Sequence, residues 1–411
     1  MEIVHIINYF AWFIFVFIAV VWILVLLQNR ERYPRNVRPK KMPFISVLIP
    51  AYNEEDTLEK TIKSVLEIDY PKNLLEVIVI NDCSKDRTRE IAEKFGNKIR
   101  LLDNEKNRGK AYSLNRGVEA AKGGLIACLD ADSVVEKGII KKMIGYFENK
   151  QIGAVTPALG VFRAQNFLEK IQYVEYLLNV FLRKTLAFMD AVHVTPGVFT
   201  IYRKNVLEDV GGFEVGNLTE DMEIALKLHK AGYKIENNMN AKSYTHCPDK
   251  WKSLFNQRIR WYRGAIQNSI KYKYMFFNPK YGNLGMFLLP FNFISVFAII
   301  IIFMLMAWNY LTAISNFIWK LYLINFDLAP LMSSFDWNFA LMNLFSSPVL
   351  FAFFGLALGA YVLYISFRVN GIEIKSRRPQ YFVYLVVFPF ALMAFWFLAL
   401  VHEVFRVKRK W

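Results

Sequence analysis

The chain contains few residues of the kinds that build disulfide frameworks or metal clusters. It has 411 residues but only three cysteines and five histidines. Cys83, Cys128 and Cys247 lack metal or redox spacing, which excludes such motifs and predicts reduced thiols in a cytoplasmic domain. Three histidines also lack ligand spacing, and we expect structural roles for them: His193, His229 and His246.

Acidic residues are scarce relative to basic ones. The sequence has 35 Asp and Glu against 51 Lys and Arg, which gives a net charge of +16. A basic excess fits nucleic acid, anionic lipid or a phosphorylated substrate as the partner. Many of the positive residues flank long apolar segments, so lipid headgroups account for part of the excess. We therefore expect membrane lipids, and no nucleic acid, among the partners.

Long apolar runs lie near both ends of the sequence. Hydrophobic residues make up 55% of the chain, and their placement indicates membrane spans rather than a larger core. Residues 6–27 form an uncharged run that is too long for a signal peptide and lacks a small-residue cleavage site. The basic residues that follow it place the next domain in the cytoplasm. Segment 311–332 is a poor span because it contains Lys320 and Asp327. Three later runs are better candidates: 284–309, 341–366 and 381–404.

Residues 42–249 alternate between strand-like and helix-like patterns. Helical spacing of apolar residues predicts helices near 87–96 and over 222–235, among others. The alternation predicts an α/β domain with a mostly parallel sheet that is covered on both faces. In such sheets, ligands bind beyond the carboxyl ends of the strands. Short β-branched runs predict strands at 45–50, 75–80, 99–103, 125–130, 153–161 and 198–203.

Polar residues follow three of these expected strands. Asn53 and Glu54 follow the first, Asp82 follows the second, and Asp130 and Asp132 follow the fourth. Two carboxylates at that spacing suit Mg²⁺ or Mn²⁺, although aspartate also shapes turns. Asn53 can equally cap the helix that comes after it.

A second acidic group opens a later helix. Thr219 fits an N-cap, and Glu220 and Asp221 fit the first helical turn. The glycine turn at 211–213 can also present these carboxylates to a cleft. A carboxylate placed there can remove a proton from an acceptor hydroxyl.

One helix face combines an amide, a cation and an aromatic ring. Gln257, Arg260 and Trp261 are three and four residues apart, so they share this face. Arginine pairs well with phosphate oxygens, and tryptophan offers a flat apolar plate. Segment 250–277 as a whole fits an amphipathic helix at a membrane interface.

The order of these motifs resembles the membrane-integrated family 2 glycosyltransferases, which include the synthases of cellulose, chitin, hyaluronan and poly-N-acetylglucosamine. The motifs are SVLIPAYNEE, VINDCSKD, NRGKAYSLNRG, CLDADS, TEDMEIALKLHKAG and QRIRW. The resemblance implies a Rossmann-like α/β domain of GT-A type with flanking transmembrane helices. It also implies an integral protein of the cell membrane, with the catalytic domain on the cytoplasmic side.

The resemblance further implies a division of the chain and a role for each motif. The expected parts are a transmembrane helix at 1–28, a basic linker at 29–41, a catalytic domain at 42–249, interfacial helices at 250–280 and about three spans in 281–411. The expected nucleotide-sugar ligands are Pro50, Tyr52, Asn53, Glu54, Asp82, Lys110, Asp130, Gln257 and Arg260. The expected metal ligands, for Mg²⁺ or Mn²⁺, are Asp130 and Asp132. The expected acceptor-binding residues are Gly197, Glu220 and Trp261, and Asp221 matches the general base.

Three functions stay open at this point. The first is a hexosyltransferase that uses a UDP-sugar and builds a β-linked polysaccharide processively, with inversion at the anomeric carbon. The second adds a single sugar to a lipid carrier or glycolipid. The third is an inactive scaffold, which the intact carboxylates argue against. Two features depart from the family pattern: Asn81 stands where an aspartate is usual, and a single apolar run precedes the domain.

Overall fold

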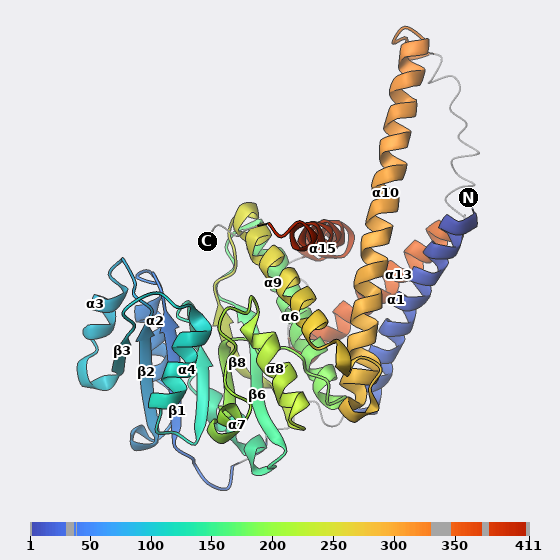
Figure 1. Cartoon of the computed structure of the whole chain (residues 1–411). Helices are drawn as coiled ribbons and strands as arrows, with labels where there is room; N and C mark the ends of the chain where they lie inside the picture. Colours follow the sequence, from blue (N-terminus) through green and yellow to red (C-terminus); the bar gives the residue numbers. More distant parts are fainter. Residues whose placement is uncertain (1, 30–36, 38, 330–346, 372–377, 408–411) are drawn as a thin grey trace.

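A computed structural model describes residues 2–29, 37, 39–329, 347–371 and 378–407 (Figure 1). Most of the expected basic linker 29–41 lies outside the described residues, as does the start of the expected span 341–366. An α/β domain at one side of the molecule carries a group of long helices at the other (Figure 1).

The domain is built on one eight-stranded sheet with the order β3-β2-β1-β4-β7-β6-β8-β5. Strands β3, β2, β1 and β4 are parallel, whereas β7 runs antiparallel to both of its neighbours. The sheet is therefore mixed, and the expectation of a mostly parallel sheet holds for one half only. The strands are β1 (Ile45–Ala51), β2 (Leu75–Asn81), β3 (Arg100–Asp103), β4 (Leu125–Leu129), β5 (Ser133–Val135), β6 (Ile152–Val161), β7 (Val198–Arg203) and β8 (Lys234–Thr245).

Helices cover both faces of the sheet, as the sequence predicts. Alternate residues of β1 point to opposite faces, so Leu48 joins a core with Leu114 and Val47 joins another with Ile62. One face carries α4 (Lys110–Ala120), α7 (Lys204–Asp209) and α8 (Glu220–Lys230). The other carries α2 (Leu58–Leu66), α3 (Thr88–Glu93) and α5 (Ile139–Met143).

Two local expectations are wrong, and a third holds in position only. The helix expected over 222–235 ends at Lys230, because Gly232 adopts a φ of +83° that closes the helix before β8 begins. Asn53 caps no helix: its own φ is +54°, and α2 begins later, at Leu58. Thr219 stands at the N-cap position of α8, but its side chain accepts no capping hydrogen bond.

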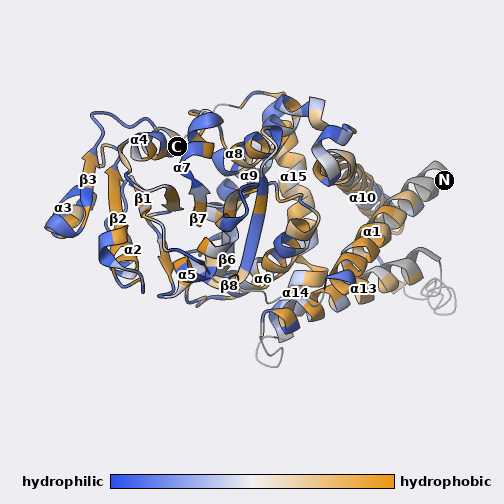
Figure 2. Ribbon diagram, turned by 90° about the horizontal axis from the view of Figure 1, so that it is seen from below, coloured by the Kyte–Doolittle hydropathy of each residue, from blue (hydrophilic) through white to orange (hydrophobic). Residues whose placement is uncertain are grey.

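Long helices join the domain to the apolar ends of the chain. Two of them, α6 (Phe167–Phe188) and α9 (Trp251–Lys271), lie between the sheet and the apolar group. The apolar group consists of α1 (Glu2–Gln28), α10 (Leu289–Leu323), α13 (Ser347–Val369), α14 (Arg378–Val386) and α15 (Phe388–Val404). Helix α1 packs against α13 and α10, and the ribbon of Figure 2 is coloured as hydrophobic along much of α1.

The described residues contain one helix, Leu284–Leu323, that is long and apolar enough to cross a membrane. The expected run 284–309 and the start of segment 311–332 therefore belong to one continuous helix. Up to Leu323, where this helix ends, segment 311–332 forms no separate span. The expected run 381–404 is bent by 41° between α14 and α15. A proline in the first turn of α15 lacks the N–H that would continue α14, which explains the break.

Candidate active site

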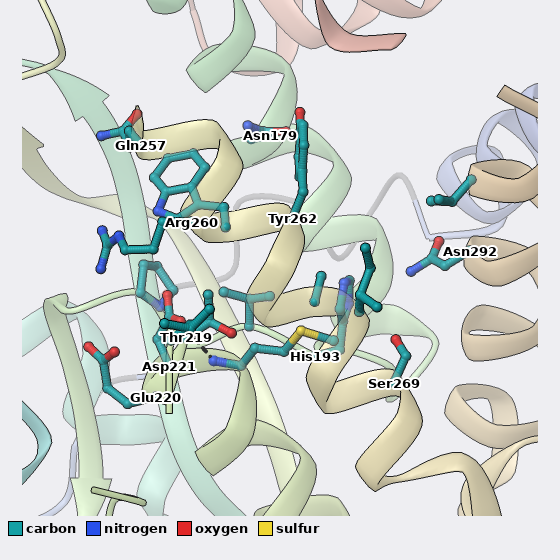
Figure 3. Close-up of a pocket in the computed structure, with 18 of the residues that line it drawn as sticks. Asn179, His193, Thr219, Glu220, Asp221, Gln257, Arg260, Tyr262, Ser269 and Asn292 are labelled. Carbon is teal, nitrogen blue, oxygen red and sulfur yellow. Dashed lines mark hydrogen bonds between the residues drawn. The ribbon is translucent and has the colours of Figure 1, made fainter. Parts of the chain in front are cut away.

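A cavity of about 1080 Å³ runs from the sheet to the apolar helices. The volume is at the upper end of small-molecule sites, so it can hold more than one ligand group. Figure 3 shows Glu220, Asp221 and Arg260 at one side and His193, Ser269 and Asn292 at the other. We call these sides the sheet end and the helix end. The expected site residues that line the cavity are Lys110, Asp130, Asp132, Gly197, Glu220, Asp221, Gln257, Arg260 and Trp261.

A cluster of ion pairs organises the sheet end. The Nζ of Lys110 lies 2.5 Å from Oδ1 of Asp130 and 3.0 Å from Oε1 of Glu220. Burial opposes the charge on Lys110, but these two carboxylates outweigh it and raise the pKa of the amine. Lys110 therefore stays protonated and links the loop after β4 to the start of α8.

The small loop before β7 sets the spacing of this cluster. A Cβ on Gly197 would lie 2.6 Å from both Oδ1 of Asp130 and Nζ of Lys110, so only glycine leaves room for the pair. The amide N–H of Asp130 donates to the carbonyl of Gly197 (2.8 Å). Thr195 donates from its backbone and its hydroxyl to the carbonyl of Asp221 (3.1 and 2.8 Å). These hydrogen bonds attach Asp130 and Asp221 to the same loop and so fix their relative positions.

The two carboxylates at the start of α8 have opposite pKa shifts. Burial acts to raise the pKa of Glu220, but the nearby Lys110 outweighs it and lowers that pKa. Burial and the negative charge of Glu220 raise the pKa of Asp221 to about 6. A base that titrates near neutral pH accepts and releases protons efficiently. Asp221 therefore lines the cavity with a pKa suited to a general base, and Glu220 helps to set that pKa.

Helix α9 supplies one wall of the cavity and is fixed closely to α8. A Cβ on Gly264 would lie 2.4 Å from Oγ1 of Thr219, so glycine permits this approach. Nδ2 of Asn268 donates to the same hydroxyl (3.0 Å), which explains why Thr219 does not cap α8. This close contact between α8 and α9 fixes where the side chains of Arg260 and Trp261 enter the cavity.

The indole ring of Trp261 is also restrained by a neighbouring charged side chain. The guanidinium of Arg258 lies over its ring, 4.3 Å from the centroid, and forms a buried 2.7 Å pair with Glu175 of α6. A paired cation against an aromatic face restricts the orientation of the indole. Sequence reasoning missed both charged residues, because an isolated Glu on an apolar helix gives no sign of its distant partner.

Asp130 and Asp132 both line the cavity and lie close enough to repel each other. Burial and the charge of Asp130 raise the pKa of Asp132, while Ser133 and Thr245 donate hydrogen bonds to it (2.9 and 3.2 Å). Two hard oxygen donors at an open cavity fit a divalent cation, which would relieve the repulsion. No group of three or more His, Cys, Asp or Glu side chains suited to a metal occurs among the described residues. The remaining ligands would have to come from a bound molecule.

The other expected nucleotide ligands lie outside the cavity lining, at the carboxyl ends of β1 and β2: Pro50, Tyr52, Asn53, Glu54 and Asp82. Asn53 organises the neighbouring loop, because its Oδ1 accepts from the backbone of Lys85 (2.9 Å). Burial, Asp132 and Asp130 raise the pKa of Glu54 despite a hydrogen bond from Thr57, which places Glu54 near the two metal-ligand candidates.

Asp82 acts on the loop that leads to Lys110. Its carboxylate accepts hydrogen bonds from Asn104 Nδ2 (2.7 Å) and from the backbone of Arg108 (3.1 Å) and Gly109 (2.7 Å). The side chain is 3% exposed. In this structure Asp82 therefore positions Lys110, and its binding of the nucleoside stays a prediction.

The helix end contains residues that sequence reasoning did not select. Three of the cavity-lining residues that the sequence did not predict belong to α6, namely Tyr176, Asn179 and Arg183, and they line the cavity together with His193 and Asn292. The spacing of the three α6 residues, i, i+3 and i+7, places them on one helix face and was the available signal. Burial lowers the pKa of His193 to about 4, with help from His229 and Arg183, so its ring is neutral at physiological pH. The sequence predicts a structural role for His193 and gives no sign that this residue lines the cavity.

Carboxylates at the carboxyl ends of parallel strands and at the start of α8, together with a mixed sheet, fit a domain of GT-A-like fold. Residues 46–211 match the family "Glycosyl transferase family 2". The chain therefore carries a family 2 glycosyltransferase domain, of the kind found in polysaccharide synthases.

Two relatives and one solved structure illustrate the similarity. The chain is 34% identical over 262 residues to a poly-β-1,6-N-acetyl-D-glucosamine synthase of Staphylococcus aureus (strain MSSA476), covering 61% of this chain and 63% of the relative. It is 33% identical over 273 residues to the enzyme of the same name from Staphylococcus epidermidis, covering 64% and 66%. The chain thus matches somewhat less than two thirds of the relatives' length. The mannosyltransferase PcManGT from Pyrobaculum calidifontis, solved with GDP-Man and Mn²⁺, shares the fold (TM-score 0.59, 18% identity, 97% of this chain and 100% of that one).

Proposed function

We propose that the protein transfers a sugar from a nucleotide-sugar donor to a hydroxyl of a glycan acceptor, with inversion at the anomeric carbon. The observation that carries the proposal is the single cavity that joins Asp221 to the Lys110–Asp130–Glu220 cluster and to Arg260. A base, a set of phosphate-binding charges and room for two sugars are what this reaction requires.

In the proposed reaction, Asp221 takes the proton of the acceptor hydroxyl. The hydroxyl oxygen then forms a bond to the anomeric carbon, while the bond from that carbon to the diphosphate breaks on the opposite face. The electron pair of that bond leaves with the nucleoside diphosphate. Arg260, which has no ion pair among the described side chains, binds the diphosphate oxygens.

Asp130 and Asp132 would hold Mg²⁺ or Mn²⁺, and the cation would offset the charge of the leaving diphosphate. Lys110 already neutralises one carboxylate of this pair. The proposed nucleoside site lies beside them, at Pro50, Tyr52, Asn53, Glu54 and Asp82. Tyr52 is 42% exposed and free to pack on a base or ribose.

The proposed donor is a UDP-sugar, and the proposed product is a β-linked polysaccharide made processively. The names of the two staphylococcal relatives support this product and make UDP-N-acetylglucosamine the first donor to test. Trp261, Glu220 and Gly197 line the same cavity as Asp221 and are the proposed acceptor-binding residues. A flat indole can pack on a sugar ring and keep the chain bound between additions.

We place the apolar helices in the cell membrane and the catalytic domain on its cytoplasmic side. The length and composition of Leu284–Leu323 support a span. At about 1.5 Å per residue, α10 is roughly 50 Å long, more than the ~30 Å of a bilayer core. The basic residues near the apolar runs support the cytoplasmic orientation.

A second candidate is transfer of a single sugar to a lipid-linked acceptor. One observation favours it: the cavity ends among apolar side chains of α10 and α15, where a lipid tail could lie.

The test is to incubate the purified full chain with a panel of radiolabelled nucleotide sugars and to size the products early, with enzyme limiting. High-mass polymer beside unused acceptor supports processive synthesis. A single added sugar with no longer species supports the second candidate. Absence of transfer and of donor hydrolysis with every nucleotide sugar would refute both.

A further inference from the structure

One glutamate near the end of an apolar helix joins α15 to α9. The carboxylate of Glu403 accepts hydrogen bonds from Nε of Arg263 (2.9 Å) and from Nε2 of Gln267 (2.9 Å to Oε1 and 3.1 Å to Oε2). Arg263 also donates from Nη1 to the carbonyl of Val407 (3.1 Å), beyond the end of α15. Arg263 and Gln267 are four residues apart, so they share one face of α9. We call Arg263, Gln267 and Glu403 the latch.

The latch is shielded from water. The side chains of Arg263 and Glu403 are 13% and 25% exposed, whereas those of the surface pair Lys137 and Glu67 are 74% and 63% exposed. A shielded pair in which both carboxylate oxygens accept hydrogen bonds is stronger and more directional than an exposed pair. The latch therefore favours one position of α15 against α9.

Aromatic contacts extend this junction on both sides of α15. The rings of Tyr262 and Trp396 are stacked, with centroids 4.1 Å apart and planes 8° from parallel, and both residues line the cavity. Phe397 meets Phe303 of α10, with centroids 5.4 Å apart. In Figure 1, α15 accordingly lies between α9 and α10. Helix α15 thus connects α9 to the helix that is apolar enough to cross a membrane.

A second face of α9 is fixed to the helix that carries the proposed base. Gly264 and Asn268 hold α9 against Thr219, at the start of α8. Arg260 precedes the latch residue Arg263 by one helical turn, and Trp261 lies between them. A shift or rotation of α9 would therefore move the cavity-lining residues and the latch together.

We propose that Glu403 is a positioning residue: by holding α9 through the latch, it sets where Arg260 and Trp261 stand relative to Asp221. The inference rests on the proposed function, in which Arg260 binds the diphosphate and Trp261 packs on the acceptor sugar. Glu403 is not among the residues that line the cavity, so it acts on the reaction only through α9.

The test compares two reactions of the full chain in detergent. One is transfer from radiolabelled UDP-N-acetylglucosamine to a β-1,6-linked N-acetylglucosamine pentamer, and the other is hydrolysis of the same donor by water. Glu403→Ala should lower kcat for transfer by roughly 10- to 100-fold, because a displaced Trp261 misorients the acceptor. Hydrolysis should fall much less, since water needs no oriented sugar. Glu403→Gln, which keeps the shape of the side chain, should show a smaller loss of the same kind.

A reversed pair separates the latch from the loss of a single side chain. Glu403→Arg combined with Arg263→Glu restores opposite charges at the same two positions, so transfer should recover well above its rate in Glu403→Ala. Transfer no faster than in Glu403→Ala would overturn the role of the ion pair.

Amide hydrogen exchange in peptides from residues 251–271 follows α9 independently of turnover. Exchange should be faster in Glu403→Ala, whereas the control Glu67→Ala, which removes the exposed pair with Lys137, should change neither exchange nor rates. Unchanged exchange in α9, or an equal fall of transfer and hydrolysis, would overturn the positioning role. If the unaltered chain uses no nucleotide sugar, the proposed function fails, while faster exchange in Glu403→Ala would still establish the latch.

Discussion

The polar groups that line the cavity differ in how far the protein itself satisfies them. At the sheet end, Lys110 contacts Asp130 and Glu220 within 3.0 Å, so its charge is compensated before any ligand binds. On the α6 wall of the cavity, the Nη1 atom of Arg183 is buried without a hydrogen-bond partner among the described residues, although the charge of Asp221 acts on this side chain. A compensated cluster is preorganised and can act on a ligand without rearranging. A buried hydrogen-bond donor without a partner gains one only when a ligand arrives.

The difference assigns separate tasks to the two ends. The sheet end holds residues at fixed distances and sets their protonation, which chemistry requires. The helix end provides unsatisfied polar groups and apolar walls, which recognition requires. The predictions that follow test whether the sheet end alone controls the chemical step.

The largest effect is expected for the base. Asp221→Asn should lower the rate of transfer by roughly 10²- to 10⁴-fold, because an amide cannot take the acceptor proton. Donor affinity should persist, since Asp221 is proposed to act on the acceptor and not on the donor. Turnover measured with radiolabelled donor, beside calorimetric titration of donor into the variant, checks both parts. Asp209→Asn, at the exposed end of α7, is the control. Retained turnover in Asp221→Asn would disprove the assignment.

Removal of divalent metal should have the next largest effect. Excess EDTA should reduce transfer by roughly 100-fold or more, because the cation contributes several kcal/mol to stabilising the leaving group. Mg²⁺ or Mn²⁺ should restore the rate. Asp132→Asn should require more metal for restoration, whereas Asp69→Asn, at an exposed pair with Lys141, should not. Full activity in EDTA would contradict the metal role of Asp130 and Asp132.

A smaller effect should follow from disturbing the ion cluster without changing its charges. The added methyl of Gly197→Ala would meet Asp130 and Lys110 at 2.6 Å, so the pair must separate. A misplacement of this size should lower kcat by roughly 10- to 100-fold. The melting temperature should change little, because the displaced atoms are ends of flexible side chains. Gly124→Ala is the control, since its Cβ would meet nothing within 4 Å. An unchanged kcat would show that the spacing of the pair is unimportant.

Much of the sheet end could be predicted from sequence, because local patterns carry the information. The run Ile45–Pro50 alternates between two cores, and the polar residues after β1, β2 and β4 follow directly from it. Asp130, Asp132 and Asp221 belong to short motifs whose order is recognisable. What these patterns could not supply is the partner of each charge, which comes from a distant part of the chain.

The helix end shows that limit clearly. Arg183 and His193 belong to no motif, and their shared cavity depends on how α6, α9 and α10 pack. The pairing of β6 with β8 also escaped prediction, because the apolar spacing of α8 continues past Lys230 and conceals the turn at Gly232. Tertiary packing decides such features, and local periodicity does not record it.

The smallest expected effect is a shift in pH dependence that isolates the coupling within the sheet end. Asp221 must be ionised to act as a base, so the rate should fall as pH drops through its pKa of about 6. Glu220 is one cause of that raised pKa, after burial, because its negative charge disfavours a second carboxylate. Glu220→Gln removes this repulsion and leaves Lys110 to stabilise the ionised form. Both changes lower the pKa, so the acid limb of kcat against pH should move to lower pH. Glu208→Gln, on the exposed side of α7, should leave the limb in place. A limb that stays fixed or moves to higher pH in Glu220→Gln would show that the protonation of Asp221 is set elsewhere, and that the two carboxylates do not act as a coupled pair.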